Sequence, residues 1–423
     1  MKVSPARLAA FEVLRRIEED RAYSSVLLPA FEEKLNPPDR ALCHELVLGV
    51  LRRLMLLDAV VRTFAGAKKL DMAVRIALRL GAYQLLFLEK IPAYSAINES
   101  VNLVQLAKKT SAKGFVNAIL RRVSEKGMPS LEFADDVERI SIETSHPTWL
   151  IEKWSTEFGI DAAEKIASAN NSVPISAFRF IGDASGEFEK SGFVPGCYLT
   201  NSITAELREK LESGEIYFQD EASQLVAHTV AQDVGQSFLD VCAAPGGKTT
   251  QVALEGKPQI AVAGDLHMTR VEHLRQTCVR QGADVKIVQY DAAGALPFAD
   301  KSFDTVLVDA PCTGTGTIRR NPEIRYTLSP DDFTDLSKKQ LAILNNASKV
   351  VTPGGRLIYS TCSLEREEDE AVVTEFLAQT TEFEKLSPRV PERFVTAHGF
   401  GRTFPHRDET DGFFIAEFRR RAI

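Results

Sequence analysis

The sequence predicts a multidomain protein with an all-α N-terminal bundle, a small α/β subdomain and a C-terminal α/β domain. Three observations predict this fold class. The 423 residues exceed what one domain usually holds. Apolar residues recur at every third and fourth position early in the chain, as in amphipathic helices. Later, short apolar runs alternate with helical stretches, which indicates a parallel sheet covered on both faces. We place the domains at 1–130, 131–220 and 221–423.

The first domain is expected to contain five or six helices. One apolar stripe runs through Leu8, Phe11, Leu14 and Ile17 at helical spacing. Asp71 is a candidate N-cap for a helix over 72–88. Two further helices are expected at 95–107 and 113–124. Residues 128–145 are polar and weakly patterned, which indicates a linker.

The remaining elements follow from the change of pattern after residue 172. Short β-like runs at 175–181 and 216–219 predict a small α/β subdomain. From residue 221 onward, we expect parallel strands at 238–241, 260–264, 285–289, 305–308 and 357–360, and a late antiparallel strand at 413–418. The helices between them are expected at 248–254, 270–281 and 335–350.

Charge is distributed unevenly along the chain. The net charge is −7, yet residues 1–130 carry 21 Lys and Arg against 13 Asp and Glu. Within that part, residues 51–130 hold 14 basic and 5 acidic side chains. This balance is typical of an RNA-facing surface, and solvated helix faces explain it equally well.

The cysteines indicate a reducing compartment. Six of them are scattered without a Cys-x-x-Cys pair, which argues against a zinc site and a disulfide framework. We therefore expect no metal. The chain has no apolar run long enough for a membrane span and no N-terminal signal core, so we expect a cytoplasmic protein that binds no membrane.

A glycine-containing turn predicts a nucleoside cofactor. Asp240 ends the first strand of the third domain, and Ala244–Lys248 turns into a helix whose N-terminus favours anionic groups. Asp265 and Asp291 follow the next two strands, where carboxylates suit ribose hydroxyls and an adenine amino group. A phosphate-binding P-loop is excluded because Cys242 stands where that motif needs glycine, and a Gly-x-Gly-x-x-Gly fingerprint is absent.

Two cysteines stand at strand ends near this turn. Cys312 follows Asp309-Ala310-Pro311, and Cys362 lies in Ser360-Thr361-Cys362-Ser363. We expect at least one of them to be catalytic, and Cys43, Cys197 and Cys278 to be structural or incidental. A nucleoside cofactor beside two thiols suits methylation of cytosine C5 in RNA, because a thiolate must first add to C6. Asp309 is placed to contact cytosine N3.

These motifs resemble the NOL1/NOP2/Sun family of RNA cytosine-5 methyltransferases. The resemblance rests on 242–249, 309–314 and 360–363, and on a C-terminal block at 402–406 and 411–414. The first domain also resembles the NusB-type RNA-binding module, an architecture similar to that of bacterial enzymes that methylate small-subunit ribosomal RNA.

The resemblance implies a Rossmann-like domain, S-adenosylmethionine as cofactor and a cytosine of 16S ribosomal RNA as substrate. It implies Cys362 as the nucleophile, with Cys312 assisting proton removal or product release, and Asp309 and Lys248 beside them. The cofactor-binding residues that it implies are Cys242, Ala243, Ala244, Pro245, Gly246, Gly247, Lys248, Asp265, Arg270, Asp291 and Asp309.

Two alternatives stay open from the sequence. The substrate of the same enzyme can be transfer RNA, because RNA shape and flipped-base contacts set the specificity. A non-catalytic RNA-binding assembly or antitermination factor is the second, although such a scaffold needs neither the thiols nor the carboxylates. We expect a monomer that holds ribosomal RNA through the basic bundle and an active-site cleft.

Overall fold

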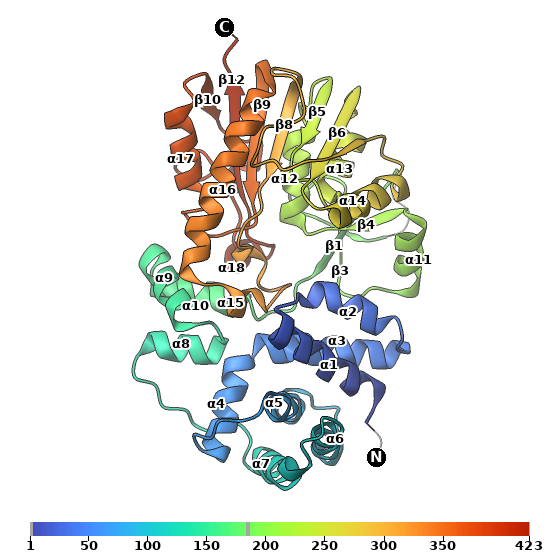
Figure 1. The fold of residues 1–423 in the computed structure, drawn as a ribbon, viewed down its shortest axis with the longest axis vertical. Helices are drawn as coiled ribbons and strands as arrows, with labels where there is room; N and C mark the ends of the chain where they lie inside the picture. The colour runs from blue at the N-terminus through green and yellow to red at the C-terminus, as the bar shows by residue number, and fades with distance from the viewer. Residues whose placement is uncertain (1–2, 183–186, 423) are drawn as a thin grey trace. The chain divides into compact units, whose positions relative to one another are not determined.

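The computed structural model describes residues 3–182 and 187–422, which form two compact units. The first unit runs to Ser172 and also includes the segment Ile318–Thr327. The second unit comprises the rest of the described chain (Figure 1). In the part of the chain that is described, none of the helices combines the length and apolarity that crossing a membrane requires.

The first unit is helical, as predicted for residues 1–130, but seven α-helices rather than five or six form in the described part of that range. Its helices are α1 (Pro5–Asp20), α2 (Ser24–Glu32), α3 (Pro37–Arg52), α4 (Leu54–Ala65), α5 (Met72–Phe87), α6 (Ala93–Leu106), α7 (Lys113–Lys126), α8 (Asp136–Thr144), α9 (Thr148–Phe158), α10 (Ile160–Ala169) and α15 (Ile324–Thr327), with a 3₁₀ turn at Thr110–Ala112. The core of the bundle is built largely from aliphatic side chains of α1, α3, α5 and α7.

Helix α5 lies at the centre of the bundle, among α4, α6 and α7 (Figure 1). The predicted cap is confirmed, because the Asp71 carboxylate accepts a hydrogen bond from the Ala73 amide. The buried guanidinium of Arg79 forms ion pairs with Glu18 of α1 and Asp58 of α4. A charge in this core is therefore paired on both sides, as burial requires.

The linker expected at 128–145 is wrong in its second half, where α8 forms. Asp135 caps this helix by accepting from the Glu138 amide, and Ile140, Ser141 and Thr144 point into the unit. The helix has nine residues, so it carries too few apolar positions to show a period in the sequence. The boundary that we placed at residue 130 also differs from this division, which falls after Ser172.

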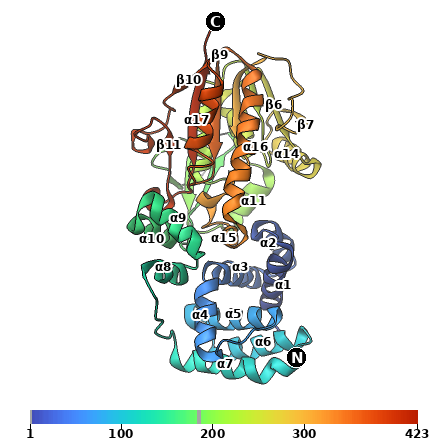
Figure 2. The ribbon, with the colours of Figure 1, turned by 60° about the vertical axis from the view of Figure 1, so that its left-hand side comes forward.

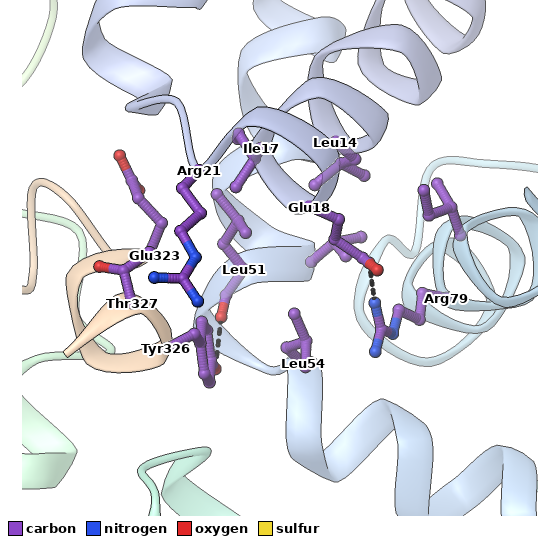
Figure 3. Close-up of a pocket in the computed structure, with 12 residues that line it drawn as sticks. Leu14, Ile17, Glu18, Arg21, Leu51, Leu54, Arg79, Glu323, Tyr326 and Thr327 are labelled. Carbon is purple, nitrogen blue, oxygen red and sulfur yellow. Dashed lines mark hydrogen bonds and ion pairs between the residues drawn. The ribbon is translucent and has the colours of Figure 1, made fainter. Parts of the chain in front are cut away.

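The segment Ile318–Thr327 returns to the first unit and is tightly held there. Glu323 is buried and accepts hydrogen bonds from the amide and hydroxyl of Ser24, at 2.6 and 2.9 Å. The Tyr326 hydroxyl donates to the carbonyl of Leu51 at 2.8 Å. Figure 3 shows Glu323, Tyr326 and Thr327 beside α1 and α3, around a cavity of about 210 Å³.

Arg325 of the same segment is completely buried among α8–α10. Its guanidinium donates to the Thr144 carbonyl at 3.0 Å and to the Asn171 side chain at 2.9 Å. Burial, followed by the charge of Arg325, lowers the pKa of His146 well below its ordinary value. His146 is therefore a neutral, hydrogen-bonded core residue.

The second unit opens with the small sheet that the sequence predicts. Its antiparallel strand order is β2 (Glu189–Lys190), β3 (Cys197–Thr200), β1 (Ser176–Phe180) and β4 (Ile216–Phe218), with α11 (Ala205–Ser213) before β4. Arg179 of β1 is buried and donates to Thr250 and Gln281 at 2.8 and 2.7 Å. These bonds join the small sheet to the rest of the unit, so no division falls at the expected boundary of residue 220.

The larger sheet confirms the five predicted parallel strands. Its order is β10 (Phe383–Leu386), β12 (Phe414–Arg420), β9 (Val351–Thr361), β8 (Phe303–Asp309), β5 (Ser237–Asp240), β6 (Ile260–Asp265) and β7 (Lys286–Gln289), and β11 (Gly401–Arg402) pairs with β12. Strand β12 is antiparallel to β9, as predicted. The chain order reverses at β5, and ligands of such sheets bind beyond the carboxyl ends of strands at this point.

Helices cover both faces of this sheet. They are α12 (Glu221–Ala231), α13 (Gly247–Gly256), α14 (Met268–Arg280), α16 (Pro330–Lys349) and α17 (Glu370–Gln379), with a short α18 (Pro405–Asp408). Alternate residues of β5, β8 and β9 pack on α16 and α17 on one face and on α12 and α13 on the other. Figure 2 shows α16 and α17 together over the strands. The continuous apolar strands are thus buried on both sides.

Candidate active site

A cavity of about 340 Å³ lies at the carboxyl ends of β5, β6, β8 and β9. Eight of the residues expected at the site line it: Cys242, Ala244, Asp265, Arg270, Asp291, Asp309, Cys312 and Cys362. The other expected residues, at 243 and 245–248, belong to the adjoining loop and the first turn of α13. The structure therefore brings the cofactor loop with its acidic partners and the two strand-end cysteines, which are far apart in the sequence, to one cavity.

The loop after β5 needs glycine where α13 begins. Gly246 has a φ of 105° and occupies the N-cap position. A Cβ atom there would lie 2.9 Å from Leu274 of α14, and one on Gly247 would lie 2.8 Å from the Tyr217 ring. Both glycines thus allow the loop to pass between neighbouring elements with the amides of α13 directed to the strand ends.

Asp265 fixes the shape of this loop. Its carboxylate accepts from the Ala244 amide at 3.2 Å and from the Leu266 amide at 2.9 Å. Arg270 donates to Asp265 at 3.1 Å and to the Ala244 carbonyl at 2.9 Å. Asp291 also lines the cavity and is exposed. The two expected acidic residues thus face one cavity from successive strand ends.

Asp240 does not line the cavity, although it ends the first strand as expected. It is buried, and its carboxylate accepts a hydrogen bond from the Thr249 hydroxyl at 2.6 Å. Burial raises its pKa to about 7, against the lowering effect of the Thr249 hydrogen bond. Asp240 therefore stabilises the first turn of α13 through Thr249 and has no direct place in the cavity wall.

The two strand-end cysteines meet. Asp309 of β8 and Ser360 of β9 are register partners, so Cys312 and Cys362 leave neighbouring strands at the same level. Their Sγ atoms lie 3.3 Å apart. The hydrogen bond to Cys362, then burial and the charges of Cys362 and Glu368, raise the pKa of the Cys312 thiol well above its ordinary value. The thiol form of Cys312 is therefore favoured over its thiolate.

Lys248 and Asp309 form an ion pair beside the thiols. The Nζ atom of Lys248 lies 2.7 Å from Asp309 Oδ2, and Ser360 donates to the other carboxylate oxygen at 2.8 Å. Burial lowers the pKa of Lys248, but the charge of Asp309 and its hydrogen bond outweigh burial and raise it overall, with a further contribution from Cys362. A cation thus stands next to the position of a Cys362 thiolate.

The remaining cysteines are placed elsewhere. Cys43, Cys197 and Cys278 are buried, and Cys242 borders the cavity. Burial is the main cause that raises the pKa of all four, to about 12 for Cys43 and about 11 for Cys278. None of them has a cysteine partner like that of Cys312 among the described hydrogen bonds.

The sequence did not reveal the part of the cavity wall that comes from α16. Lys339 and Ile343 line it, one helical turn apart. Both read in the sequence as ordinary positions of an amphipathic helix, and only the packing of α16 over β8 brings them to the cavity. Leu266 and His267, which follow β6, were missed as well.

Comparison with known proteins agrees with this architecture. Residues 227–419 match the family described as 16S rRNA methyltransferase RsmB/F, and residues 4–125 match the NusB family. The probable ribosomal RNA small subunit methyltransferase B of Bacillus subtilis is 34% identical over all of both chains. The ribosomal RNA small subunit methyltransferase B of Pseudomonas putida is 33% identical over 97% of each.

The chain belongs to the ribosomal RNA small subunit methyltransferase B family. As a family member it combines a NusB-like helical domain with an α/β methyltransferase domain. The crystal structure of PH0851 has a TM-score of 0.83 to this structure, with 25% identity over 99% of this chain and 100% of that one. NSun6 from Pyrococcus horikoshii, solved with SFG, shares the fold at a TM-score of 0.56 and 20% identity, over 65% of this chain and 98% of that one.

Proposed function

We propose that the protein transfers a methyl group from S-adenosylmethionine to C5 of a cytosine in 16S ribosomal RNA, through a covalent bond between Cys362 and C6. The proposal is supported by the family and by the residues at the strand ends. The observation that carries it is the pair of thiols, 3.3 Å apart, at the wall of the cavity that Asp265 and Asp291 also line.

The cavity fits the cofactor by the chemistry of its donors. Asp265 suits the ribose hydroxyls and Asp291 the adenine amino group. The main chain of the loop 242–248 can approach the ligand closely. Lys248 and Arg270, two basic residues of this site, are each paired with a carboxylate, which offsets their charge against that of a sulfonium. When bound, S-adenosylmethionine supplies an electrophilic methyl group.

Cys362 activates the base. The C5 carbon of cytosine is a weak nucleophile, and addition of a thiolate to C6 makes it enamine-like. The Lys248 ammonium and the Cys312 thiol, whose Sγ atom lies 3.3 Å from that of Cys362, stand beside the attacking group. The attacking thiol is thus the member of the pair with a nearby cation and a donor.

Asp309 and Cys312 serve the steps on either side of methylation. Asp309 lies next to the thiols, oriented by Lys248 and Ser360, and we assign it the contact to cytosine N3 during addition. After C5 carries the methyl group, a base takes the C5 proton, the C–H electron pair re-forms the C5=C6 double bond, and the C6–Sγ bond breaks to release the Cys362 thiolate. We assign assistance of proton removal and release to Cys312, whose thiol can donate to the leaving Sγ atom 3.3 Å away.

A trapping experiment distinguishes the roles of the two thiols. Cys362→Ala should abolish methylation and every covalent link to RNA, because no other group adds to C6. Cys312→Ala should still attack and methylate, but should release the adduct slowly and accumulate a protein–RNA complex on denaturing gels in the presence of cofactor. Cys278→Ala, which removes a buried thiol outside the cavity, is the control and should behave as the unmodified protein.

Two results would overturn this assignment. Trapping by Cys362→Ala, with none by Cys312→Ala, would reverse the roles of the thiols. Unchanged methyl transfer in both variants would refute the covalent mechanism. Mapping 5-methylcytosine in RNA from a deletion strain decides the substrate, since loss of a mark from transfer RNA rather than 16S ribosomal RNA would contradict the proposal.

A further inference from the structure

We propose that Glu368 is a positioning residue that fixes the two thiols at their contact distance. The proposal rests on the roles assigned above to Cys312 and Cys362. Glu368 lies in the turn between β9 and α17 and does not line the cavity. Its carboxylate nevertheless contacts the residue that directly follows each of the two cysteines, Thr313 and Ser363.

The contacts to the Cys312 loop use both the backbone and the side chain of Thr313. The Thr313 amide donates to Glu368 Oε1 at 2.9 Å, and the Thr313 hydroxyl donates to Oε2 at 2.5 Å. An amide bond to the residue after Cys312 fixes the path of the main chain there. The hydroxyl bond fixes the orientation of the Thr313 side chain toward Glu368.

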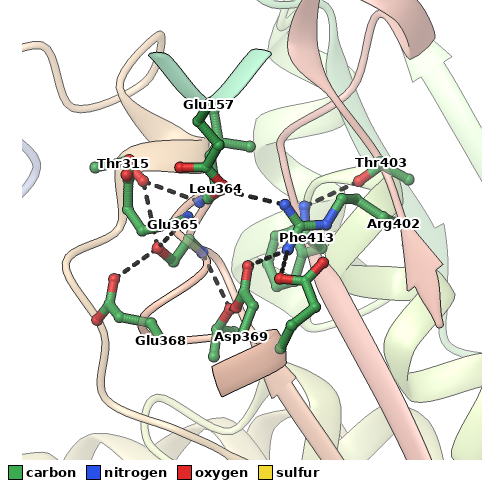
Figure 4. A network of polar contacts seen from close by, with 12 residues as sticks. Glu157, Thr315, Leu364, Glu365, Glu368, Asp369, Arg402, Thr403 and Phe413 are labelled. Carbon is green, nitrogen blue, oxygen red and sulfur yellow. Dashed lines mark hydrogen bonds and ion pairs between the residues drawn. The ribbon is translucent and has the colours of Figure 1, made fainter. Parts of the chain in front are cut away.

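The contact to the Cys362 loop runs through Ser363. Its hydroxyl donates to Glu368 Oε2 at 2.6 Å and accepts from the Glu365 amide at 3.1 Å. The next residue along the chain, Asp369, accepts from the hydroxyl of Thr361, which precedes Cys362. Figure 4 shows Glu368 and Asp369 directed toward the loop that carries Leu364 and Glu365. Adjacent carboxylates thus hold Cys362 from both sides, and Glu368 alone also reaches the other thiol loop.

Glu368 is itself held in place. Its side chain is completely buried, and Gln340 of α16 donates to Oε1 at 2.9 Å. The Tyr359 hydroxyl donates to the Glu368 carbonyl at 2.5 Å, so the backbone is anchored to β9. A fully buried carboxylate with four donors is a rigid bridge, because all its acceptor sites are used and none exchanges with water.

The role requires two acceptor oxygens more than it requires charge. Glutamine has the same length, and its carbonyl oxygen can accept from Thr313 and Gln340. Its amide can donate to the hydroxyls of Thr313 and Ser363, which turn to accept. Alanine removes the bridge and takes away the acceptor of four buried hydrogen bonds. Glu368→Gln is therefore the rescue variant and Glu368→Ala the disrupting one.

The first measurement needs neither RNA nor cofactor. Diamide, an azo oxidant, accepts two electrons and two protons from two thiols as their Sγ–Sγ bond forms, and its N=N bond becomes a hydrazine. The rate at which the peptide linked through Cys312 and Cys362 appears, followed by mass spectrometry, reports how often the two Sγ atoms meet. We expect Glu368→Ala to slow this rate about tenfold or more and Glu368→Gln to restore it.

A matched control separates positioning from general loss of stability. Glu417 is also a completely buried carboxylate of this sheet, paired with Arg356 at 2.8 Å and outside the thiol loops. Glu417→Ala should lower the melting temperature and leave the crosslinking rate near that of the unmodified protein. If Glu368→Ala does not fold, Thr313→Val with Ser363→Ala removes only the two hydroxyl donors and should slow crosslinking in the same direction.

The second measurement is single-turnover methyl transfer to 16S ribosomal RNA. Glu368→Ala should lower the maximal rate and leave unchanged the S-adenosylmethionine concentration that gives half of it. Crosslinking at the unmodified rate in folded Glu368→Ala, or in the double variant, would overturn the positioning role. If crosslinking is slowed in Glu368→Ala but the unmodified protein itself methylates no RNA, the proposed function is overturned and the positioning role stands. The two failures are thus distinguishable.

Discussion

Lys248 and Asp309 form a 2.7 Å ion pair although 61 residues separate them in the chain. Lys248 comes from the first turn of α13 and Asp309 from the last residue of β8. Their contact joins the loop after β5 to the strand that leads to Cys312. It also places the Lys248 ammonium over the ring of Phe413, at 4.9 Å, within the C-terminal block. Three motifs therefore meet at one cation.

Removal of this cation should slow the reaction. Lys248→Met keeps the length of the side chain and leaves Asp309 and a Cys362 thiolate without their positive neighbour. We expect single-turnover methyl transfer to fall by about tenfold to a thousandfold, as when one charge-stabilising donor is lost. Lys338→Met, at an exposed position of α16, is the control. Equal rates for Lys248→Met and the unmodified protein would remove Lys248 from the site.

Cofactor binding should depend on Asp265. We expect Asp265→Ala to weaken S-adenosylmethionine binding by about 1–3 kcal/mol, as for a lost charge-assisted hydrogen bond. Part of this effect comes from the loop, because Asp265 also accepts from the Ala244 amide. Calorimetry measures the affinity, with the exposed Asp300→Ala as control. An unchanged dissociation constant would exclude Asp265 from the binding site.

RNA binding should depend on exposed basic side chains of the bundle. Replacement of Lys108, Lys109, Arg121 and Arg122 by Gln should weaken RNA binding and flatten its salt dependence, because fewer counterions are released. Lys109 is already paired with Asp71, and Arg122 donates to the Phe64 carbonyl. We therefore expect Lys108 and Arg121 to account for more of the effect.

The matched control for that experiment is a second basic pair of the same unit. Arg15 is half-buried and Arg16 is exposed on α1, and both form ion pairs with glutamate and aspartate side chains one turn away. Arg15→Gln with Arg16→Gln should change the salt slope little. If the dependence of RNA affinity on salt concentration is unchanged in the fourfold variant, these basic residues only form a solvated surface and do not bind RNA.

Stability should fall with rising pH through Asp240. Burial raises the pKa of this carboxyl to about 7 in the folded protein, against an ordinary value near 3.9. Between these values the unfolded chain has lost the proton that the folded protein keeps, so the free energy of unfolding decreases as pH rises from about 4 to about 7. Asp240→Asn cannot ionise and should lack this decrease.

Melting temperatures of the two proteins without cofactor, from pH 5 to pH 8, test this prediction. The advantage of Asp240→Asn should grow with pH and level off above about pH 7. Asp300→Asn, an exposed position, should follow the unmodified protein. Parallel curves for Asp240→Asn and the unmodified protein would contradict the raised pKa of Asp240.

The sequence by itself determined the elements and their chemistry. Period-2 and period-3.6 patterns depend on neighbours along the chain, so most long strands and helices were predictable, although β9 and α16 begin five or six residues earlier than predicted and α12 was missed. The short α8 and the terminal β10 and β11 were not, because so few residues carry no clear period. The loop after β5 and the two strand-end thiols were visible because their residue types are tied to a reaction rather than to packing.

The tertiary structure decided which of these residues meet. Only the register of β8 with β9 brings Cys312 and Cys362 to 3.3 Å. Only the packing of distant segments turns Lys339 toward the cavity, joins Glu368 to both thiol loops and returns Ile318–Thr327 to the helical unit. Such contacts link residues far apart in the chain, and hydrogen bonds and burial at that range leave no periodic trace in the sequence.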